Sequence, residues 1–345
     1  MNDFVFIIAT PLLVFVAIDW AKGHWTGKEI TQFVFVVAYG HHLPGMMRAY
    51  GDRDLFQRFR TRFILGPIGF LLVCVGSTTS GFSSIFLLAT AWGWWHYSMQ
   101  TYGFLRIYDA KAGSNARTTQ VLDRAMCLAW FATPILLFSV YSTLLPGAMT
   151  TVQASGLPIL SKMTLEGLHT TVAAVTTCVT GAFLINAAWQ WSHGRGPSPQ
   201  KLFLMLTTFS FYWYSVTTVA NIMVAYALFE IFHDIQYLTI VWAFNRGRTE
   251  QATNLPAFTR FLFQPRLSRI ALYVALILAY GMLERTSRLQ SGEMMSGVWQ
   301  GVFLASTLLH YYYDGFIWKL REASTQTPLD IQSAARGEAV ATAGA

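Results

Sequence analysis

Histidine occurs inside four strongly apolar stretches of the chain, each of which ends in a basic residue. The stretches read AYGHHLPGMMR, WGWWHYSMQTYGFLR, FEIFHDIQYLTIVWAFNR and LLHYYYDGFIWK, and they carry His41 with His42, His96, His233 and His310. An ionisable side chain in an apolar, membrane-type segment is energetically costly and usually faces a bundle interior, where it has a function. Because imidazole is a common ligand of transition metals, histidines that meet at one place would form a buried metal centre.

Carboxylates accompany two of these histidines at helical spacing. Glu230 precedes His233 by three residues and Asp314 follows His310 by four, so each pair shares a helix face. The E-x-x-H spacing is how di-iron carboxylate proteins present two ligands from one helix. Asp234 points about 100° away from His233 and ranks lower. The predicted metal ligands are therefore His41, His42, His96, Glu230, His233, His310 and Asp314, with catalytic roles for Glu230 and Asp314.

The donor types indicate which metal such a centre would hold. Imidazole and carboxylate together suit iron, manganese or zinc, whereas a thiolate centre would need clustered cysteines. Cys74, Cys127 and Cys178 lie singly in apolar runs without CxxC spacing. We predict non-haem iron, because dioxygen and apolar substrates both concentrate in lipid. Two irons are favoured if both carboxylates are ligands and one iron if only histidines are, and either His41 or His42 can be the one that faces inward.

Composition indicates an all-α, polytopic membrane helix bundle. The chain is 54% hydrophobic and 12% charged, whereas soluble domains carry about 25% charged residues. A spanning helix needs about 20 mostly apolar residues, and about ten segments qualify on that criterion. They run approximately over 4–20, 31–47, 61–76, 82–105, 123–145, 167–190, 202–220, 222–244, 268–284 and 297–318. Segments 202–220 and 222–244 form one continuous apolar run that is too long for a single crossing. The turn between them, near 217–221, is predicted from this length alone.

Basic residues set the predicted orientation. They gather in short segments such as 48–62 and 246–269, while 77–81 and 146–161 contain none. Because basic loops stay in the cytoplasm, both termini are predicted to be cytoplasmic and the protein to lie in the bacterial inner membrane. The four histidine-bearing helices then run from outside to inside, with every histidine roughly 10–20 Å from the cytoplasmic boundary. The formal charge of +7 follows from these loops and does not indicate nucleic-acid binding.

The domain organisation is simple. Residues 1–321 are predicted to form a single transmembrane helical domain that contains the metal centre, without a recognisable repeat. Residues 322–345 are polar and rich in Ala, Thr and Gln, which predicts a disordered cytoplasmic tail. The N-terminal segment lacks the basic start and small-residue cleavage site of a signal peptide, so it is read as a retained first helix.

This pattern of single histidines on separate helices resembles the histidine-rich membrane non-haem iron oxygenases. The nearer likeness is to the bacterial membrane β-carotene dioxygenases, which also gather such histidines around iron. Membrane fatty-acid desaturases and hydroxylases are less similar, because their H-x3-H and H-x2-H-H boxes are absent and the last helix carries H-x3-D instead. The resemblance lies in the type and distribution of the predicted ligands, and the sequences themselves are not aligned. It implies oxidative chemistry on a lipid or isoprenoid.

The predicted function is that of an integral membrane oxygenase or desaturase. Its partners would be dioxygen, a hydrophobic small molecule that enters from the bilayer and, if the basic residues converge at the cytoplasmic face, an electron-donor protein or an anionic head group. One alternative is a b-type haem electron-transfer protein, with two histidines as axial ligands. Another is a metal or proton transporter, in which the same groups act as a relay.

Overall fold

The computed structural model describes residues 4–82, 84–114, 116–134, 162–219, 222–251, 255–289 and 293–331, with the isolated residues 136 and 153. All regular secondary structure in these ranges is helical, which confirms the all-α prediction. The elements are η1(Phe4–Ile8), α1(Thr10–Lys22), α2(Gly27–Gly40), α3(His42–Gly51), α4(Arg53–Arg58), α5(Arg60–Thr79), α6(Ser84–Lys111), α7(Arg117–Pro134), α9(Lys162–Ser192), α10(Pro199–Thr217), α11(Ile222–Gln251), α12(Ala257–Leu262), α13(Leu267–Leu289), α14(Glu293–Ile317), α15(Ala323–Gln326) and η3(Thr327–Leu329).

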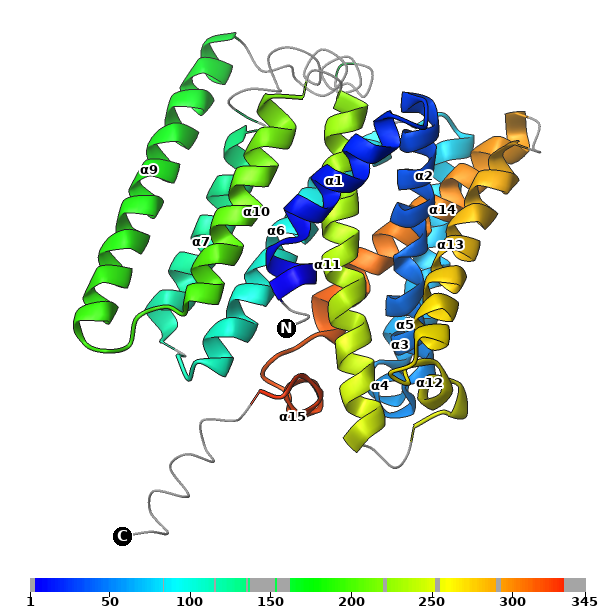
Figure 1. The fold of residues 1–345 in the computed structure, drawn as a ribbon. Helices are drawn as coiled ribbons and strands as arrows, with labels where there is room; N and C mark the ends of the chain where they lie inside the picture. The colour runs from blue at the N-terminus through cyan, green and yellow to red at the C-terminus, as the bar shows by residue number, and fades with distance from the viewer. Residues whose placement is uncertain are drawn as a thin grey trace.

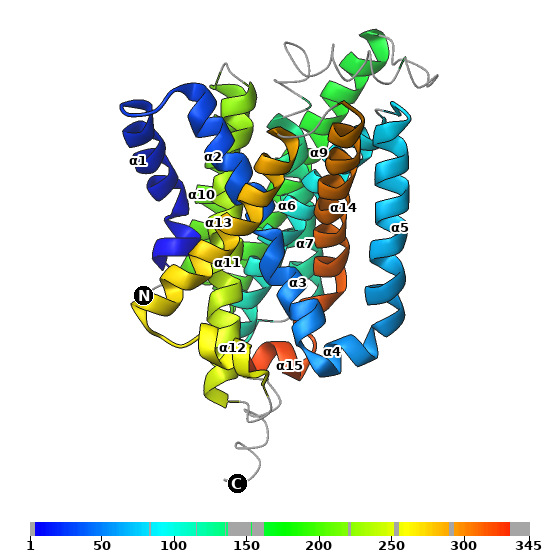
Figure 2. The same ribbon diagram turned by 90° about the vertical axis from the view of Figure 1, so that its right-hand side faces the viewer.

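The long helices lie side by side as one bundle, and the short helices α4, α12 and α15 lie together at one end of it (Figures 1 and 2). Each apolar segment predicted to cross a membrane overlaps a helix, as far as the described residues go. The apolar run over 202–244 is divided near 217–221, as predicted, since α10 ends at Thr217 and α11 begins at Ile222. Most of 135–145, the end of another predicted span, lies outside the described residues.

Two described helices, α5 and α9, are long and apolar enough to cross a membrane by length and composition. The prediction of about ten spans is not supported at that number. The reason is visible in α11, where Glu230 and Asp234 interrupt the apolar sequence and lower its mean hydropathy. Helices α5 and α9 stand at the periphery of the bundle, α9 in Figure 1 and α5 in Figure 2, with most of their side chains exposed.

The segment predicted as one helix over 31–47 is two helices, α2 and α3, that meet at His41. Thr26 and Glu29 cap the start of α2 reciprocally. Hydrogen bonds from the backbone and then the side chain of Thr26 lower the pKa of Glu29. At the other end, Gly40 lies against the carbonyl of Ile277, where a side chain would not fit. Pro44 falls in the first turn of α3, where its missing N–H is tolerated.

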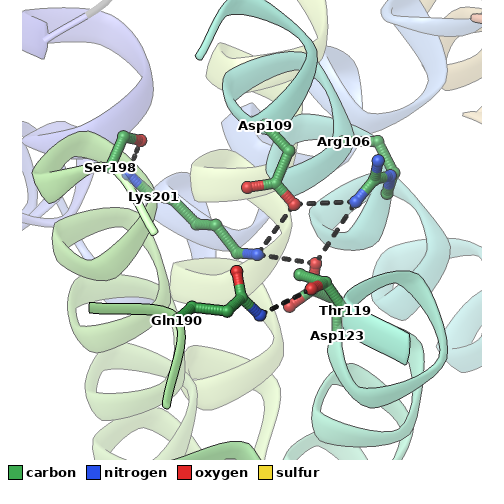
Figure 3. A network of polar contacts seen from close by, with 7 residues as sticks. All are labelled: Arg106, Asp109, Thr119, Asp123, Gln190, Ser198 and Lys201. Carbon is green, nitrogen blue, oxygen red and sulfur yellow. Dashed lines mark hydrogen bonds and ion pairs between the residues drawn. The ribbon is translucent and has the colours of Figure 1, made fainter. Parts of the chain in front are cut away.

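A buried network of charges joins α6, α7 and α10 (Figure 3). Lys201 Nζ donates to Asp109 at 2.8 Å and to Asp123 at 2.7 Å, and Arg106 Nη1 donates to Asp109 at 2.7 Å. Lys201 is fully buried. Two cations and two carboxylates therefore offset each other in the interior, which a single buried charge could not do.

Part of the segment predicted as a disordered tail, 322–331, is described and ordered. Here α15 and η3 follow the end of α14, and Leu329 and Ile331 pack with Phe244 of α11. Gly247 of α11 is in close contact with the backbone of Pro328. Residues 332–345 lie outside the described ranges.

Candidate metal centre

The bundle brings the four histidine-bearing stretches together at one buried place. His41 comes from the junction of α2 and α3, His96 from α6, His233 from α11 and His310 from α14. Their relative exposures are 1%, 6%, 2% and 1%. Imidazoles are not usually removed from water in such numbers without partners, because each ring nitrogen then needs a hydrogen bond or a ligand bond.

The shortest contact between these histidines joins His41 and His310, whose Nε2 atoms lie 3.1 Å apart. The ring of His96 lies 4.7 Å from that of His310 and 5.1 Å from that of His233, measured between centroids. The ring of His233 in turn lies 5.3 Å from that of His41. Each of the four imidazoles thus contacts two of the others, so that they form a closed ring.

Asp314 directs one carboxylate oxygen at this ring of four imidazoles. Its Oδ1 accepts hydrogen bonds from Tyr237 Oη at 3.2 Å and Trp318 Nε1 at 3.0 Å. Its Oδ2 lies 3.8 Å from His310 Nε2 and 4.0 Å from His96 Nε2. Two atoms that are each about 2.0–2.2 Å from one metal ion lie at most about 4.4 Å apart. The oxygen therefore stands where a third ligand beside the two histidines would be.

Two further carboxylates adjoin His41 on its other side. Asp234 Oδ1 lies 2.7 Å from His41 Nδ1. This contact fixes the ring so that its other nitrogen, Nε2, faces His310, as a carboxylate does for a metal-ligating histidine. Glu230 accepts a hydrogen bond from the hydroxyl of Tyr97. Its carboxylate also lies close to His41 and Asp234, so negative charge gathers in the interior at this point.

The geometry and donor chemistry fit a metal ion. Three groups in the described chain have ligand atoms within 4.8 Å of one another: His41, His233 and His310; His96, His310 and Asp314; and His41, Glu230 and Asp234. The buried nitrogens His96 Nε2, His233 Nε2 and His310 Nδ1 have no hydrogen-bond partner among the described residues. A bound cation would provide a partner for these unpaired nitrogens and would offset the charge of the three nearby carboxylates.

His42 is buried next to the centre but takes another partner. Its Nδ1 lies 3.1 Å from Ser306 Oγ, and its ring stacks on His310 with centroids 5.0 Å apart. It belongs to none of the three groups with ligand spacing among the described residues. Of the adjacent pair, His41 is therefore the residue that the structure brings to the centre. The break between α2 and α3 lets both rings point inward.

Asp234, Tyr97, Tyr237 and Trp318 were not among the predicted ligands, yet they contact the centre. A signal for three of them was present in the spacing. Asp234 follows Glu230 by four residues, Tyr237 follows His233 by four, and Trp318 follows Asp314 by four. Positions four apart share a helix face. Asp234 points away from His233 on its own helix, and it reaches the centre through His41, which comes from another element.

A methyl group at position 45 is expected to disturb the centre by crowding Tyr237, without replacing a ligand. The Cβ of Gly45→Ala would lie 2.9 Å from Tyr237 Oη and 3.7 Å from both Asp314 Oδ1 and His310 Nδ1. Tyr237 must then move away from Asp314. We expect metal affinity to fall about 10- to 100-fold, as when a residue that orients a ligand is lost. Competitive chelator titration measures this.

The matched control for that substitution is Gly51→Ala on the same helix, where a Cβ meets nothing within 4 Å. It should leave the affinity unchanged. Equal affinities for the two variants would show that the Tyr237–Asp314 contact does not support the centre.

Comparison of the chain with protein-family models, with curated proteins and with solved structures gives no match.

Proposed function

We propose that the protein is an integral membrane non-haem iron oxidoreductase, an oxygenase or desaturase that uses dioxygen on a hydrophobic substrate of the lipid or isoprenoid class. The observation that carries the proposal is the convergence of buried histidines from four elements with Asp314, Glu230 and Asp234. The group of His96, His310 and Asp314 is a two-histidine, one-carboxylate set, the type that non-haem iron oxygenases use.

Exposed apolar side chains support a membrane location. On α5, Leu65 and Leu72 are 60% and 70% exposed, and on α9 Leu184 and Ile185 are 59% and 73% exposed. Such surfaces are too apolar for contact with water over two whole helices. The short helices α4 and α12, which belong to the basic segments 48–62 and 246–269, lie at one end of the bundle, which suits the cytoplasmic side of a bacterial inner membrane. The polytopic arrangement with both termini in the cytoplasm remains part of the proposal.

Iron held by these histidines would supply one-electron redox chemistry with dioxygen. The chain's own residues perform the remaining tasks. His96, His310 and Asp314 would hold the ion, and Asp234 keeps His41 in the orientation that presents Nε2. The Tyr97 hydroxyl donates a hydrogen bond to Glu230 at the edge of the centre. The rings of Tyr97 and Tyr311 lie 4.5 Å from His233 and 4.7 Å from His96, and they exclude water from that side.

The contacts between the rings argue against haem. Two axial imidazole nitrogens, each about 2 Å from an iron, lie about 4 Å apart on opposite sides of a porphyrin. His41 Nε2 and His310 Nε2 are 3.1 Å apart. The ring of His96 packs directly against that of His310, and the ring of His233 against that of His41.

The test is elemental analysis combined with an optical spectrum, on protein purified in detergent without chelator. We expect about one or two irons per chain and no Soret band. A Soret band would move the protein to haem-based electron transfer. Protein without any transition metal, which also fails to bind added Fe²⁺, would overturn the proposal. In that case the histidines would be packing or proton-relay groups.

A further inference from the structure

The candidate centre approaches the surface at Asp314. The side chain of Asp314 is 12% exposed, whereas that of His310 is fully buried. The indole of Trp318 donates its N–H to Asp314 Oδ1 and is itself partly exposed. Trp318 directly follows the end of α14 and precedes α15, so its side chain joins a candidate metal ligand to the end of the bundle where α4 and α15 lie (Figure 2).

Stacked side chains surround Trp318 on its inner side. The guanidinium of buried Arg48 lies 4.0 Å from the ring of Trp318 and 4.0 Å from that of Phe244. The two rings meet edge to face with centroids 5.0 Å apart. Arg248 lies 5.7 Å from the centroid of the Phe244 ring and is held by an ion pair to Asp52. The indole is therefore fixed in position between Arg48, Phe244 and the carboxylate of Asp314.

The surface beside Trp318 is basic. Lys319 and Arg321 follow it in the chain, and Arg62 lies 5.0 Å from the ring of Phe316. Arg58 belongs to the same surface through its ion pair with Glu322. Burial and then the nearby charge of Arg321 lower the pKa of Lys319. Basic side chains therefore outnumber acidic ones on this surface, which leaves it with a net positive charge.

We propose that this surface, formed by Arg58, Arg62, Trp318, Lys319 and Arg321, docks an acidic one-electron carrier protein, and that Trp318 is the point at which the electron enters. The inference rests on the proposed function, because it needs a redox-active ion. In each transfer the reduced carrier loses one electron and the ferric centre gains one to become ferrous. No bond forms or breaks. A basic patch favours an acidic partner because opposite charges accelerate and orient the encounter.

The experiment measures the rate at which reduced plant-type [2Fe–2S] ferredoxin, an acidic one-electron carrier, reduces the ferric protein in stopped flow. The variant Lys319→Glu/Arg321→Glu is expected to lower the second-order rate constant at least about tenfold at low ionic strength, and added salt should shrink the difference. Lys28→Glu, at the start of α2, is the matched control and should leave the rate unchanged. Dithionite, a small reductant that needs no docking surface, should reduce all the proteins at similar rates.

A second pair of variants isolates the indole. Trp318→Phe keeps a ring but loses the hydrogen bond to Asp314, and Trp318→Leu loses both. If the ring carries the electron, Trp318→Leu slows reduction by ferredoxin at least about tenfold relative to Trp318→Phe, with equal iron content. Equal rates in all variants and in the wild type, on protein that contains iron, would overturn the docking surface and leave the metal centre standing. Protein without iron would instead remove the proposed function itself.

Discussion

His310→Ala is expected to remove nearly all bound iron, to below about a tenth of the wild-type content. His310 belongs to two of the three groups with ligand spacing, the one with His41 and His233 and the one with His96 and Asp314. Its loss therefore breaks both, and no nearby side chain can replace it from α14. Removing one ligand of a coordination set leaves an open position, and affinity falls far more than when only an orienting residue is lost. Iron per chain is measured by elemental analysis after desalting.

The same grouping predicts an order among the variants. His41→Ala also breaks two groups, so its loss of iron should approach that of His310→Ala. Glu230→Gln breaks one group and keeps the size of the side chain, so most of the iron should remain. If Glu230→Gln instead halves an iron content of two, the centre holds two ions and Glu230 ligates one of them.

Two histidines outside the centre provide matched controls. His24 and His193 are exposed, and each places Nδ1 2.8 Å from the backbone carbonyl of a tryptophan four residues earlier. His24→Ala and His193→Ala should keep the full iron content. Retention of wild-type iron by His310→Ala, or its equal loss in the two control variants, would contradict the assignment of the centre.

The sequence predicted the members of the centre better than their arrangement. The histidines lie in separate apolar segments, at similar distances from a basic end. Because the rise per residue of a helix is fixed, this spacing predicts that they lie at one depth. The choice of His41 over His42 was not accessible in this way. It depends on the break between α2 and α3, where Gly40 contacts α13 and Pro44 lacks the N–H that a continuous helix would use. Asp234 ranks below the predicted ligands in the sequence because its partner, His41, comes from another element.

The number of membrane-spanning helices was predicted less well for a related reason. Apolar composition identified where the helices lie, but it cannot tell a lipid-facing helix from one that the bundle itself surrounds. Helix α11 is such a case, since its side chains from Ala227 to Glu230 are buried among neighbouring helices. Arg106 and Lys201 adjoin the ends of predicted spans 82–105 and 202–220, where basic residues usually mark membrane orientation. In the structure both are buried in the network of Figure 3, where they neutralise Asp109 and Asp123.

That network leads to the second large effect, which is on stability. Lys201→Met removes a cation that two buried carboxylates share and leaves Arg106 to offset both. Breaking a buried ion pair by removing one partner costs about 3–5 kcal/mol of the free energy of unfolding. We expect a loss of that size, measured by denaturant titration in detergent with circular dichroism. By contrast, Arg246→Gln removes an exposed pair with Glu250 and should cost less than about 1 kcal/mol.

A double variant separates the charge imbalance from the loss of packing. Lys201→Met/Asp123→Asn leaves Arg106 and Asp109, which are 2.7 Å apart and balance each other. If uncompensated charge causes the loss, the double variant should be more stable than Lys201→Met alone. A double variant that is less stable would mean that the methylene packing and hydrogen bonds of Lys201, rather than its charge, hold α10 to α6 and α7. Since Arg106 lies ten residues, about 15 Å, beyond His96 on the same helix, iron content per folded chain should be the same in all these variants.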